Sequence, residues 1–361
     1  MAGGEGLEKG VFSEPEIRLA MRNHGMPLEA LRDDLTPPGL HYLLTHFDIP
    51  AVDLDTWTLA VDGLVEHSLS LSMADLRVLP QEERTVTMEC AGNGRSALDR
   101  RPVSQPWVQE AIGTACWAGV PVSLLLERAG VEEGAVEAVF SSLDHGIDGG
   151  IEQHYQRSLT LELARSAEPI VAIAMNDGPL PPQHGFPARL LVPGWYGMTN
   201  VKWLSRITLV DAPFEGYQQA IAYRVRQTAD EPGEAITRML PRALMVPPGI
   251  PDFASRDRIV MGPCTISGRA WSGWGAIERV DVSTDGGGRW QPATLDQGTG
   301  DGHARWCSWS HRWDAPDPGE HVLMARARDT AGNEQPDQPD WNAGGYLNNA
   351  VQRVRVTVRG G

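Results

Sequence analysis

Cys90 has the surroundings of a thiolate metal ligand. It stands in the run Met88-Glu89-Cys90-Ala91-Gly92-Asn93-Gly94-Arg95, directly after the alternating segment 84–88, which predicts a β-strand. Ala91 and Gly92 allow the backbone to turn tightly, and Arg95 and the loop amides would favour the ionised sulfur. An unpaired cysteine alone is more often a small buried hydrophobic residue, so this interpretation depends on the rest of the chain.

A second set of polar residues stands far downstream. The chain runs from His184-Gly185-Phe186-Pro187 through Arg189 to Gly194, and then to Asn200-Val201-Lys202. Arg189 lies inside an apolar run, 186–192, where a guanidinium group needs a partner. Arg189, Lys202 and His184 supply cations and hydrogen-bond donors, which suit an anionic ligand.

The segments around Cys90, His184 to Gly194 and Asn200 to Leu204 together resemble the sulfite oxidase family of molybdopterin oxidoreductases. The resemblance extends from about Thr36 to the C-terminus. It implies a molybdenum cofactor whose metal is held by Cys90 beside the dithiolene sulfurs of one pterin. It also implies a set of cofactor contacts, namely Tyr42, Thr45, His46, Cys90, Asp144, His184, Arg189, Asn200, Val201 and Lys202.

The resemblance also implies a pocket for a small oxyanion. Arg95, Trp107 and Tyr223 match residues of the family's substrate pocket, and Cys90, Arg95 and Tyr223 match its catalytic residues. The other cysteines, Cys116, Cys264 and Cys307, are predicted to be structural.

Two departures from the family affect the predicted substrate pocket. Leu44 stands two residues before His46, and Gly344 follows Trp341-Asn342-Ala343, at positions where the family carries arginines. Either Arg224, Arg101 or another cation compensates, or the substrate carries less charge than sulfite.

The order of predicted elements indicates an α+β catalytic domain followed by an all-β domain. Residues 1–40 are predicted to wrap the next domain, with a helix from Glu14 to Met21. Residues 41–238 would form the molybdopterin-binding catalytic domain of the sulfite oxidase type, with a helix over 119–129 and a buried strand over 170–175. Residues 239–251 contain four prolines and are predicted to be a linker. Short alternating strands over 252–361 predict an immunoglobulin-like sandwich, which matches the family's dimerisation domain.

Composition restricts the class of protein. The 361 residues are 41% hydrophobic and 22% charged, which is typical of a globular protein with about two domains. The net charge of −16 disfavours nucleic-acid binding, and no apolar run is long enough to span a membrane. No signal-peptide pattern is visible at the N-terminus, so we expect a cytoplasmic location, or a periplasmic one if a leader has been removed. The four cysteines are expected to be reduced.

Three functions are compatible with this sequence. The first is oxidation of sulfite to sulfate by oxygen-atom transfer, with electrons passed to a separate carrier such as a cytochrome, because no haem motif is present in the chain. The second keeps the cofactor and changes the substrate to another sulfur compound, or reduces an S- or N-oxide. The third is a non-enzymatic protein that keeps the fold for homodimerisation or partner binding; the intact set of Cys90, His184, Arg189 and Lys202 disfavours it.

Overall fold

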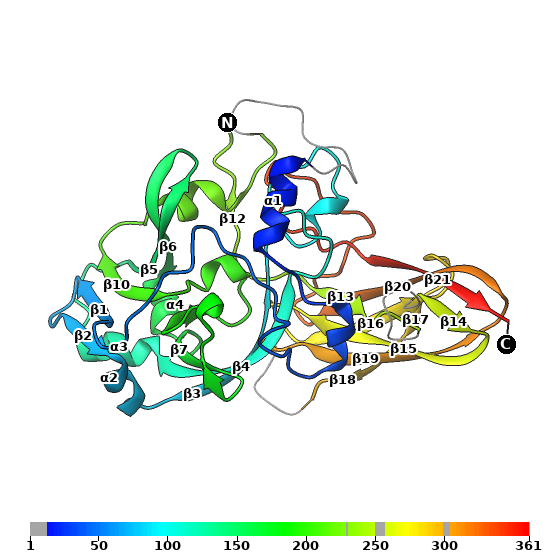
Figure 1. Ribbon diagram of the computed structural model, residues 1–361, viewed down its shortest axis with the longest axis horizontal. Coiled ribbons are helices and arrows are strands. Elements are labelled where there is room, and N and C mark those ends of the chain that lie inside the picture. The colour runs from blue at the N-terminus through cyan, green and yellow to red at the C-terminus, as the bar shows by residue number, and fades with distance from the viewer. Residues whose placement is uncertain (1–12, 229, 250–256, 299–303, 361) are drawn as a thin grey trace.

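The structure of the protein, a computed structural model, describes residues 13–228, 230–249, 257–298 and 304–360 (Figure 1). The N-terminal part begins with α1 (Glu14–Arg22) and η1 (Leu28–Arg32). A capping box starts α1, in which the Ser13 amide donates to the Glu16 carboxylate at 2.9 Å. The predicted first helix is thus confirmed.

The domain that is predicted to be catalytic, called the catalytic domain below, contains two sheets. The first has the order β2-β1-β10-β5-β6 and consists of β2 (Leu69–Ser72), β1 (Thr58–Gly63), β10 (Leu204–Val210), β5 (Glu137–Asp148) and β6 (Ile151–Thr160). The second has the order β3-β4-β7-β8, with β9 also paired to β7, and consists of β3 (Glu82–Glu89), β4 (Ile112–Pro121), β7 (Ile170–Met175), β8 (Gly178–Pro179) and β9 (Arg189–Leu191). Parallel pairing occurs between β1 and β10, and the other pairs in these sheets are antiparallel.

Short helices and turns connect these strands. The helices are α2 (Met73–Val78), α3 (Val122–Ala129) and α4 (Leu161–Arg165), and the tighter turns are η2 (Arg95–Ala97), η3 (Pro182–His184), η4 (Gly197–Thr199) and the π-helical η5 (Gln218–Ala222). A small ribbon pairs β11 (Arg224–Val225) with β12 (Glu234–Ala235). The predicted strands over 84–88 and 170–175 are confirmed as β3 and β7.

The predicted helix over 119–129 begins three residues late. Gly119, Val120 and Pro121 continue β4 and pair with β7, so Pro121 precedes α3 and does not lie in its first turn. A β-carbon on Gly119 would lie 2.0 Å from the Val171 carbonyl oxygen, which shows how closely the two strands approach. The end of the helix is as predicted, because Gly130 adopts a positive φ of 67° there.

The C-terminal domain consists of two further sheets that share one buried apolar cluster. One sheet has the order β13-β15-β19-β18, with β13 (Arg242–Met245), β15 (Gly262–Trp271), β19 (Cys307–Ala315) and β18 (Thr294–Asp296). The other has the order β14-β21-β20-β16-β17, with β14 (Arg258–Val260), β21 (Gln352–Arg359), β20 (Gly319–Asp329), β16 (Ile277–Ser283) and β17 (Gln291–Pro292).

The prediction that residues 239–251 form a linker is wrong over 242–245. These four residues form β13, are all buried, and pair with Gly268–Trp271 of β15. The prolines that indicated a linker flank this strand at Pro241 and Pro247 and do not interrupt it. The last predicted linker residues, 250 and 251, lie outside the described part of the chain.

The N-terminal segment contacts both domains, which lie side by side in Figure 1. The Thr36 amide donates to the Thr114 carbonyl of the catalytic domain at 2.7 Å. From the C-terminal domain, Arg269 donates to the Leu31 carbonyl at 2.8 Å and the Trp306 indole donates to the Asp34 carbonyl at 3.0 Å. These bonds tie the segment to both domains.

Candidate active site

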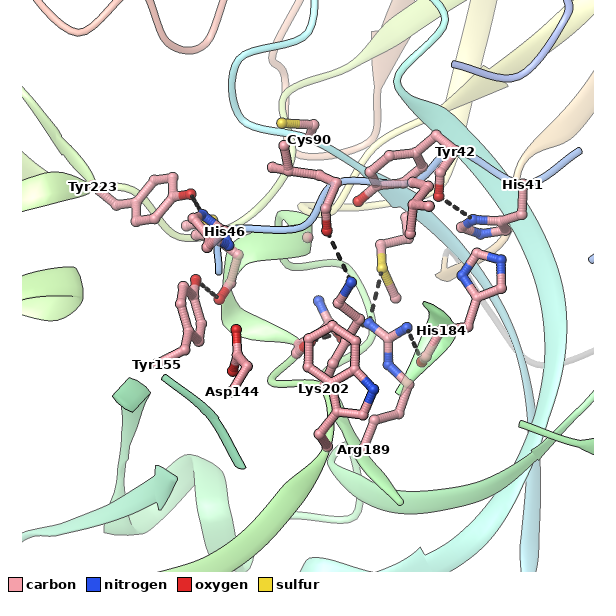
Figure 2. A pocket seen from close by; sticks show the side chains of 17 residues that line it. His41, Tyr42, His46, Cys90, Asp144, Tyr155, His184, Arg189, Lys202 and Tyr223 are labelled. Carbon is pink, nitrogen blue, oxygen red and sulfur yellow. Dashed lines mark hydrogen bonds between the residues drawn. The ribbon is translucent and has the colours of Figure 1, made fainter. Parts of the chain in front are cut away.

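A pocket lies in the catalytic domain, and we call it the inner pocket (Figure 2). Its walls come from the N-terminal segment, from the end of β3, from β5 and β6, and from the region between η3 and Tyr223. The residues that line it are His41, Tyr42, Leu43, Leu44, His46, Met88, Cys90, Asp144, Tyr155, His184, Arg189, Gly197, Met198, Asn200, Lys202, Trp203 and Tyr223.

Cys90 stands where β3 ends and the chain turns into the pocket wall. Its amide donates to the Ala111 carbonyl at 3.0 Å, and its own carbonyl accepts from the Asn93 amide at 2.9 Å. Gly94 continues the turn with a φ of 86°, which a residue without a β-carbon adopts easily. The turn therefore places the thiol at the pocket surface, with only 7% of the residue exposed.

Burial decides the protonation state of this thiol. Burial raises the pKa of Cys90, and the charge of Arg95, the Gly92 amide and the Trp107 indole oppose this rise only in part. Arg95 and the Gly92 amide thus favour the thiolate, as expected, but they do not decide its pKa. Removal of the sulfur from water outweighs them, so the thiolate requires a further positive charge, such as a metal ion.

Two cations lie towards the other side of the inner pocket (Figure 2). Arg189 donates to the His184 carbonyl at 2.9 Å and to the Asn200 carbonyl at 3.1 Å. Lys202 donates to the Leu44 carbonyl at 2.8 Å and to the Gln183 carbonyl at 3.1 Å. Within the described residues neither cation forms an ion pair with a carboxylate, and the Nε atom of Arg189 has no hydrogen-bond partner.

The pKa values of these cations reflect their enclosure. Burial lowers the pKa of Arg189 to about 10. Burial, together with the charge of Arg189, lowers the pKa of Lys202 to about 7, and Asp144 opposes this change. Two enclosed cations held by neutral carbonyl groups form a site that is complementary to an anion.

Histidines in this region are held neutral. Burial lowers the pKa of His41 to about 4 and that of His184 to about 2. His184 Nε2 lies 3.1 Å from the Pro38 carbonyl, to which it donates as a neutral ring. The two rings are in edge contact, with centroids 5.3 Å apart. Neutral rings of this kind offer hydrogen bonds to a ligand without adding charge.

A wider outer cavity opens on the other side of Cys90. It is lined by residues from α1, the Leu44–Phe47 segment, the Cys90–Arg95 turn, the Pro102–Trp107 loop, Ile147–Asp148, the Tyr217–Arg226 segment and the Ala343–Tyr346 loop. Four residues, Leu44, His46, Cys90 and Tyr223, line both this cavity and the inner pocket. The two spaces therefore meet at Cys90.

Tyr223 presents its hydroxyl group at this junction. The π-helical turn η5 directly precedes it, and such turns are frequent at functional sites. Tyr223 Oη lies 2.5 Å from Nε2 of His46, and the two groups share a hydrogen bond (Figure 2). Burial lowers the pKa of His46 to about 4 and raises the pKa of Tyr223, so both groups are neutral near pH 7.

Arg95 is held against the outer cavity by the C-terminal domain. It donates to the Gly345 carbonyl at 3.2 Å, and its guanidinium carbon lies 5.0 Å from the ring centre of Tyr346. It also donates to Ser104 at 3.0 Å. A β-carbon on Gly92 would come within 2.6 Å of this guanidinium group, so Gly92 leaves the room that Arg95 fills.

The C-terminal domain also supports the Cys90 turn from behind. Glu89, which is buried, forms an ion pair with Arg242 of β13 at 2.7 Å. Its second carboxylate oxygen accepts from the Trp271 indole of β15 at 2.9 Å. The residue next to the candidate metal ligand is thus fixed by two side chains of the second domain.

Comparison with known proteins places this site in a family. Residues 46–218 match the oxidoreductase molybdopterin binding domain, and residues 241–359 match the Mo-co oxidoreductase dimerisation domain. The chain belongs to the sulfite oxidase family of molybdopterin oxidoreductases. It is 36% identical over 358 residues to the mitochondrial sulfite oxidase of Homo sapiens, covering 92% of this chain and 63% of that protein. The chain thus spans less than two thirds of the length of that relative.

Other members of the family differ in the reactions that their names describe. The chain is 31% identical to the NADH nitrate reductase of Solanum lycopersicum, covering 96% of this chain and 40% of that protein. The crystal structure of the sulfane dehydrogenase SoxCD from Paracoccus pantotrophus resembles this fold with a TM-score of 0.79 and 29% sequence identity. That match covers 92% of this chain and 84% of the SoxCD chain.

The inner pocket fits the cofactor of the family. The unpartnered Arg189 Nε and the enclosed Lys202 suit the phosphate of a molybdopterin, and the neutral histidines and Asp144 suit its ring edge. Burial raises the pKa of Asp144. Within the described residues no group of three or more His, Cys, Asp or Glu side chains could hold a metal ion. A metal here would depend on Cys90 and on ligands that the pterin supplies.

The structure brings most of the predicted site residues together. Those predicted to contact the cofactor and found in the inner pocket are Tyr42, His46, Cys90, Asp144, His184, Arg189, Asn200 and Lys202. Those predicted to contact the substrate and found in the outer cavity are Arg95, Trp107 and Tyr223. Thr45 lines the outer cavity and not the inner pocket.

Val201 lines neither space, and its contact with the cofactor stays a prediction. Its side chain is fully buried in the main apolar cluster, and its carbonyl accepts from the Leu190 amide at 2.8 Å. The residue therefore holds β9 in place.

Sequence reasoning missed three residues of the site, His41, Tyr155 and Tyr346. Tyr346 lies two residues beyond Gly344, and only the fold brings it beneath Arg95. Arg101, considered above as a replacement cation, does not line the outer cavity; it forms a fully buried ion pair with Glu16. All four cysteines are free of disulfide bonds. None of the described helices combines the length and apolar character required to cross a bilayer.

Proposed function

We propose that this protein is a molybdenum-dependent oxidoreductase of sulfur compounds that oxidises sulfite to sulfate and passes the electrons to a separate carrier. The proposal rests on the position of the Cys90 thiol, which borders both the inner pocket and the outer cavity. The inner pocket has the cations and donors that a molybdopterin needs, the outer cavity admits a small molecule, and Cys90 borders both. When bound, the cofactor supplies the transferable oxygen and the two-electron redox chemistry.

The roles of the protein residues follow from their contacts. Arg189 and Lys202 neutralise the anionic part of the cofactor. Arg95, stacked on Tyr346 at the outer cavity, holds the oxyanion oxygens of the substrate. Tyr223 donates a hydrogen bond at the junction and is oriented by His46 at 2.5 Å. Because His46 has a lowered pKa and Tyr223 a raised pKa, the Tyr223 hydroxyl keeps its proton over the physiological pH range.

We further propose that the chain acts as a homodimer through its C-terminal domain. The match of residues 241–359 to the Mo-co oxidoreductase dimerisation domain supports this, and the two sheets around one core support an immunoglobulin-like sandwich. The electron acceptor is proposed to be a separate redox protein such as a cytochrome. The name sulfane dehydrogenase of the SoxCD structure agrees with chemistry on sulfur.

A second candidate keeps the cofactor and changes the substrate to another sulfur compound. The specific observation in its favour is Leu44, an apolar side chain that lines both spaces where the family carries a cation. Arg101 does not compensate, because it is paired with Glu16. Arg224 lines the outer cavity, but it donates to the Pro232 and Gly233 carbonyls.

The test is a substrate screen on molybdenum-loaded protein. Sulfite, thiosulfate and organic sulfur compounds would be supplied with ferricyanide as electron acceptor. Nitrate and S- and N-oxides would be supplied with reduced viologen as donor. We expect oxidation of a sulfur compound; activity restricted to the reductive assays would contradict the proposal. A Cys90→Ala protein serves as the control for background reaction.

A further inference from the structure

Three arginines, Arg95, Arg224 and Arg226, line the outer cavity. Arg95 is the arginine whose charge acts on the Cys90 thiol, and within the described residues it forms no ion pair with a carboxylate. Arg224 and Arg226 also line the cavity, but their guanidinium groups donate to backbone carbonyls of Pro232, Gly233 and Ile221. Arg95 is engaged in the same way, with the Gly345 and Gln105 carbonyls and with Ser104. All three arginines therefore keep their charge, and Arg95 is the one that acts on Cys90 at the inner end of the cavity.

Part of the wall outside Arg95 is apolar, and the rest is polar, with Asn23, Gln105, Asp148 and Gln218 among its residues. Val103, Ile147 and Ile221 line the cavity and are 54%, 72% and 48% exposed. Leu19 of α1 and Leu44 at the junction extend the same apolar lining inwards. Exposed apolar side chains gathered around one cavity indicate that its ligand has an apolar part. Sulfite has no apolar part, so its binding would not be stabilised by contact with these side chains.

The cavity is also large relative to a four-atom oxyanion. Together with the solvent at its mouth it spans about 1640 Å³, against about 630 Å³ for the inner pocket measured in the same way. A ligand that places one anionic group at Arg95 and extends outwards would contact Val103, Ile147 or Ile221. A cation beside Cys90, an apolar part of the wall and space that extends outwards suit a ligand with an anionic head and an apolar tail.

We propose that the outer cavity also takes an organic sulfinate as substrate, R–SO₂⁻, in which an apolar group replaces one oxygen of sulfite. This inference rests on the proposed function, because it uses the same oxygen transfer to a sulfur lone pair. The single negative charge matches Arg95, and the R group lies along the apolar wall.

The reaction balances as R–SO₂⁻ plus water giving R–SO₃⁻, two protons and two electrons. One new S–O bond forms at the sulfur lone pair, and no bond to carbon breaks. Sulfur is oxidised, and the electrons pass in one-electron steps to a separate redox protein, for which ferricyanide substitutes in the assay.

The first experiment compares sulfite with methane-, butane- and benzenesulfinate on molybdenum-loaded protein with ferricyanide. Each buried methylene is worth roughly a fourfold gain in binding, so kcat/KM should rise by about tenfold to sixtyfold from methane- to butanesulfinate. Sulfonate as the product, detected by ion chromatography, would identify oxygen transfer. A kcat/KM that is independent of R, or turnover of sulfite without any sulfinate, overturns the inference and leaves the proposed function intact.

Failure of the proposed function gives a different result. If the molybdenum-loaded protein oxidises neither sulfite nor any sulfinate, both proposals fall. Turnover of neutral thioethers with no sulfinate turnover overturns the sulfinate inference alone, since the anionic group would then have no role.

Variants test whether the apolar wall is responsible. Ile147→Ala and Ile221→Ala should each lower the ratio of butane- to methanesulfinate kcat/KM by a few-fold, and both residues are exposed enough to tolerate the change. Val78→Ala removes a comparably exposed apolar side chain on α2, away from the cavity, and should leave the ratio unchanged. An unchanged ratio in both cavity variants contradicts the assignment of the wall.

Equilibrium binding gives a readout that does not depend on turnover. Calorimetry of the loaded protein with the two products, butanesulfonate and sulfate, should show tighter binding of butanesulfonate. Leu44→Arg, which adds a second cation at the junction, should reverse this preference towards the dianion sulfate. Tighter binding of sulfate to the native protein overturns the inference.

Discussion

Lys202 is expected to destabilise the cofactor-free protein, and its replacement by methionine tests this. The ammonium group is enclosed beside Arg189, and its hydrogen-bond partners among the described residues are the Leu44 and Gln183 carbonyls. Methionine has a similar length and no charge. The Lys202→Met protein should therefore unfold at a higher temperature than the native protein below pH 7, and it should retain less molybdenum.

The magnitude follows from the pKa of Lys202, which is lowered from 10.5 to about 7. At about 1.4 kcal/mol for each pH unit, this change corresponds to at most roughly 5 kcal/mol of lost stability. Solvent screening reduces this value, and the two carbonyls left without a donor cost about 1–3 kcal/mol. A net gain of about 1–3 kcal/mol, or a few degrees in the unfolding temperature, is expected below pH 7.

The pH dependence provides the sharper test. Because the folded-state pKa lies below the unfolded value, the penalty grows as the pH falls from 10.5 to about 7 and is fully present below that. The advantage of Lys202→Met should therefore shrink as the pH rises. Near pH 10 the variant should be the less stable protein, because neutral Lys202 still donates hydrogen bonds there.

The assay is thermal unfolding at pH 6, 8 and 10 of protein made in a host that lacks the pterin pathway. Molybdenum content is measured by elemental analysis after expression in a competent host. Arg206→Met is the matched control, because Arg206 is an exposed cation on the adjacent strand, paired with Asp62. A Lys202→Met protein that is less stable than the native protein at pH 6 would refute the reasoning.

Four further predictions follow from the site. Cys90→Ser should leave the molybdenum content near zero by elemental analysis, while the unfolding temperature changes by only a few degrees. Arg95→Gln should raise the Michaelis constant for an anionic substrate by about tenfold to a hundredfold in steady-state kinetics, since one charge-assisted contact is lost. Light scattering at micromolar concentration should report a dimer; a monomer would contradict the proposed assembly. The unfolding temperature of cofactor-free protein should fall as the pH drops from 6.5 to 4, because His41, His46 and His184 have lowered pKa values and are buried as neutral rings. An unfolding temperature that is flat over this range would exclude that origin.

Several elements could be predicted from local sequence because local chemistry determines them. The alternation before Cys90 predicted β3, the apolar run at 170–175 predicted β7, and Gly130 marked the end of α3. The start of α3 could not be predicted, because pairing of Gly119 and Val120 with β7 extends the strand that precedes it. The same limit applies to β13, whose four residues become a strand only through pairing with β15.

The sequence by itself determined which side chains are available for chemistry and, through the order of its motifs, the family to which the chain belongs. Only the tertiary structure decided how they are grouped. The fold forms an inner pocket and an outer cavity that meet at Cys90, and it places Tyr346 beneath Arg95. It also buries Arg101 in an ion pair with Glu16. The physical reason is that pKa values, ion pairing and cavity shape depend on contacts between segments that are far apart in the chain. Arg95 and Gly345, for example, are joined by one hydrogen bond across 250 positions.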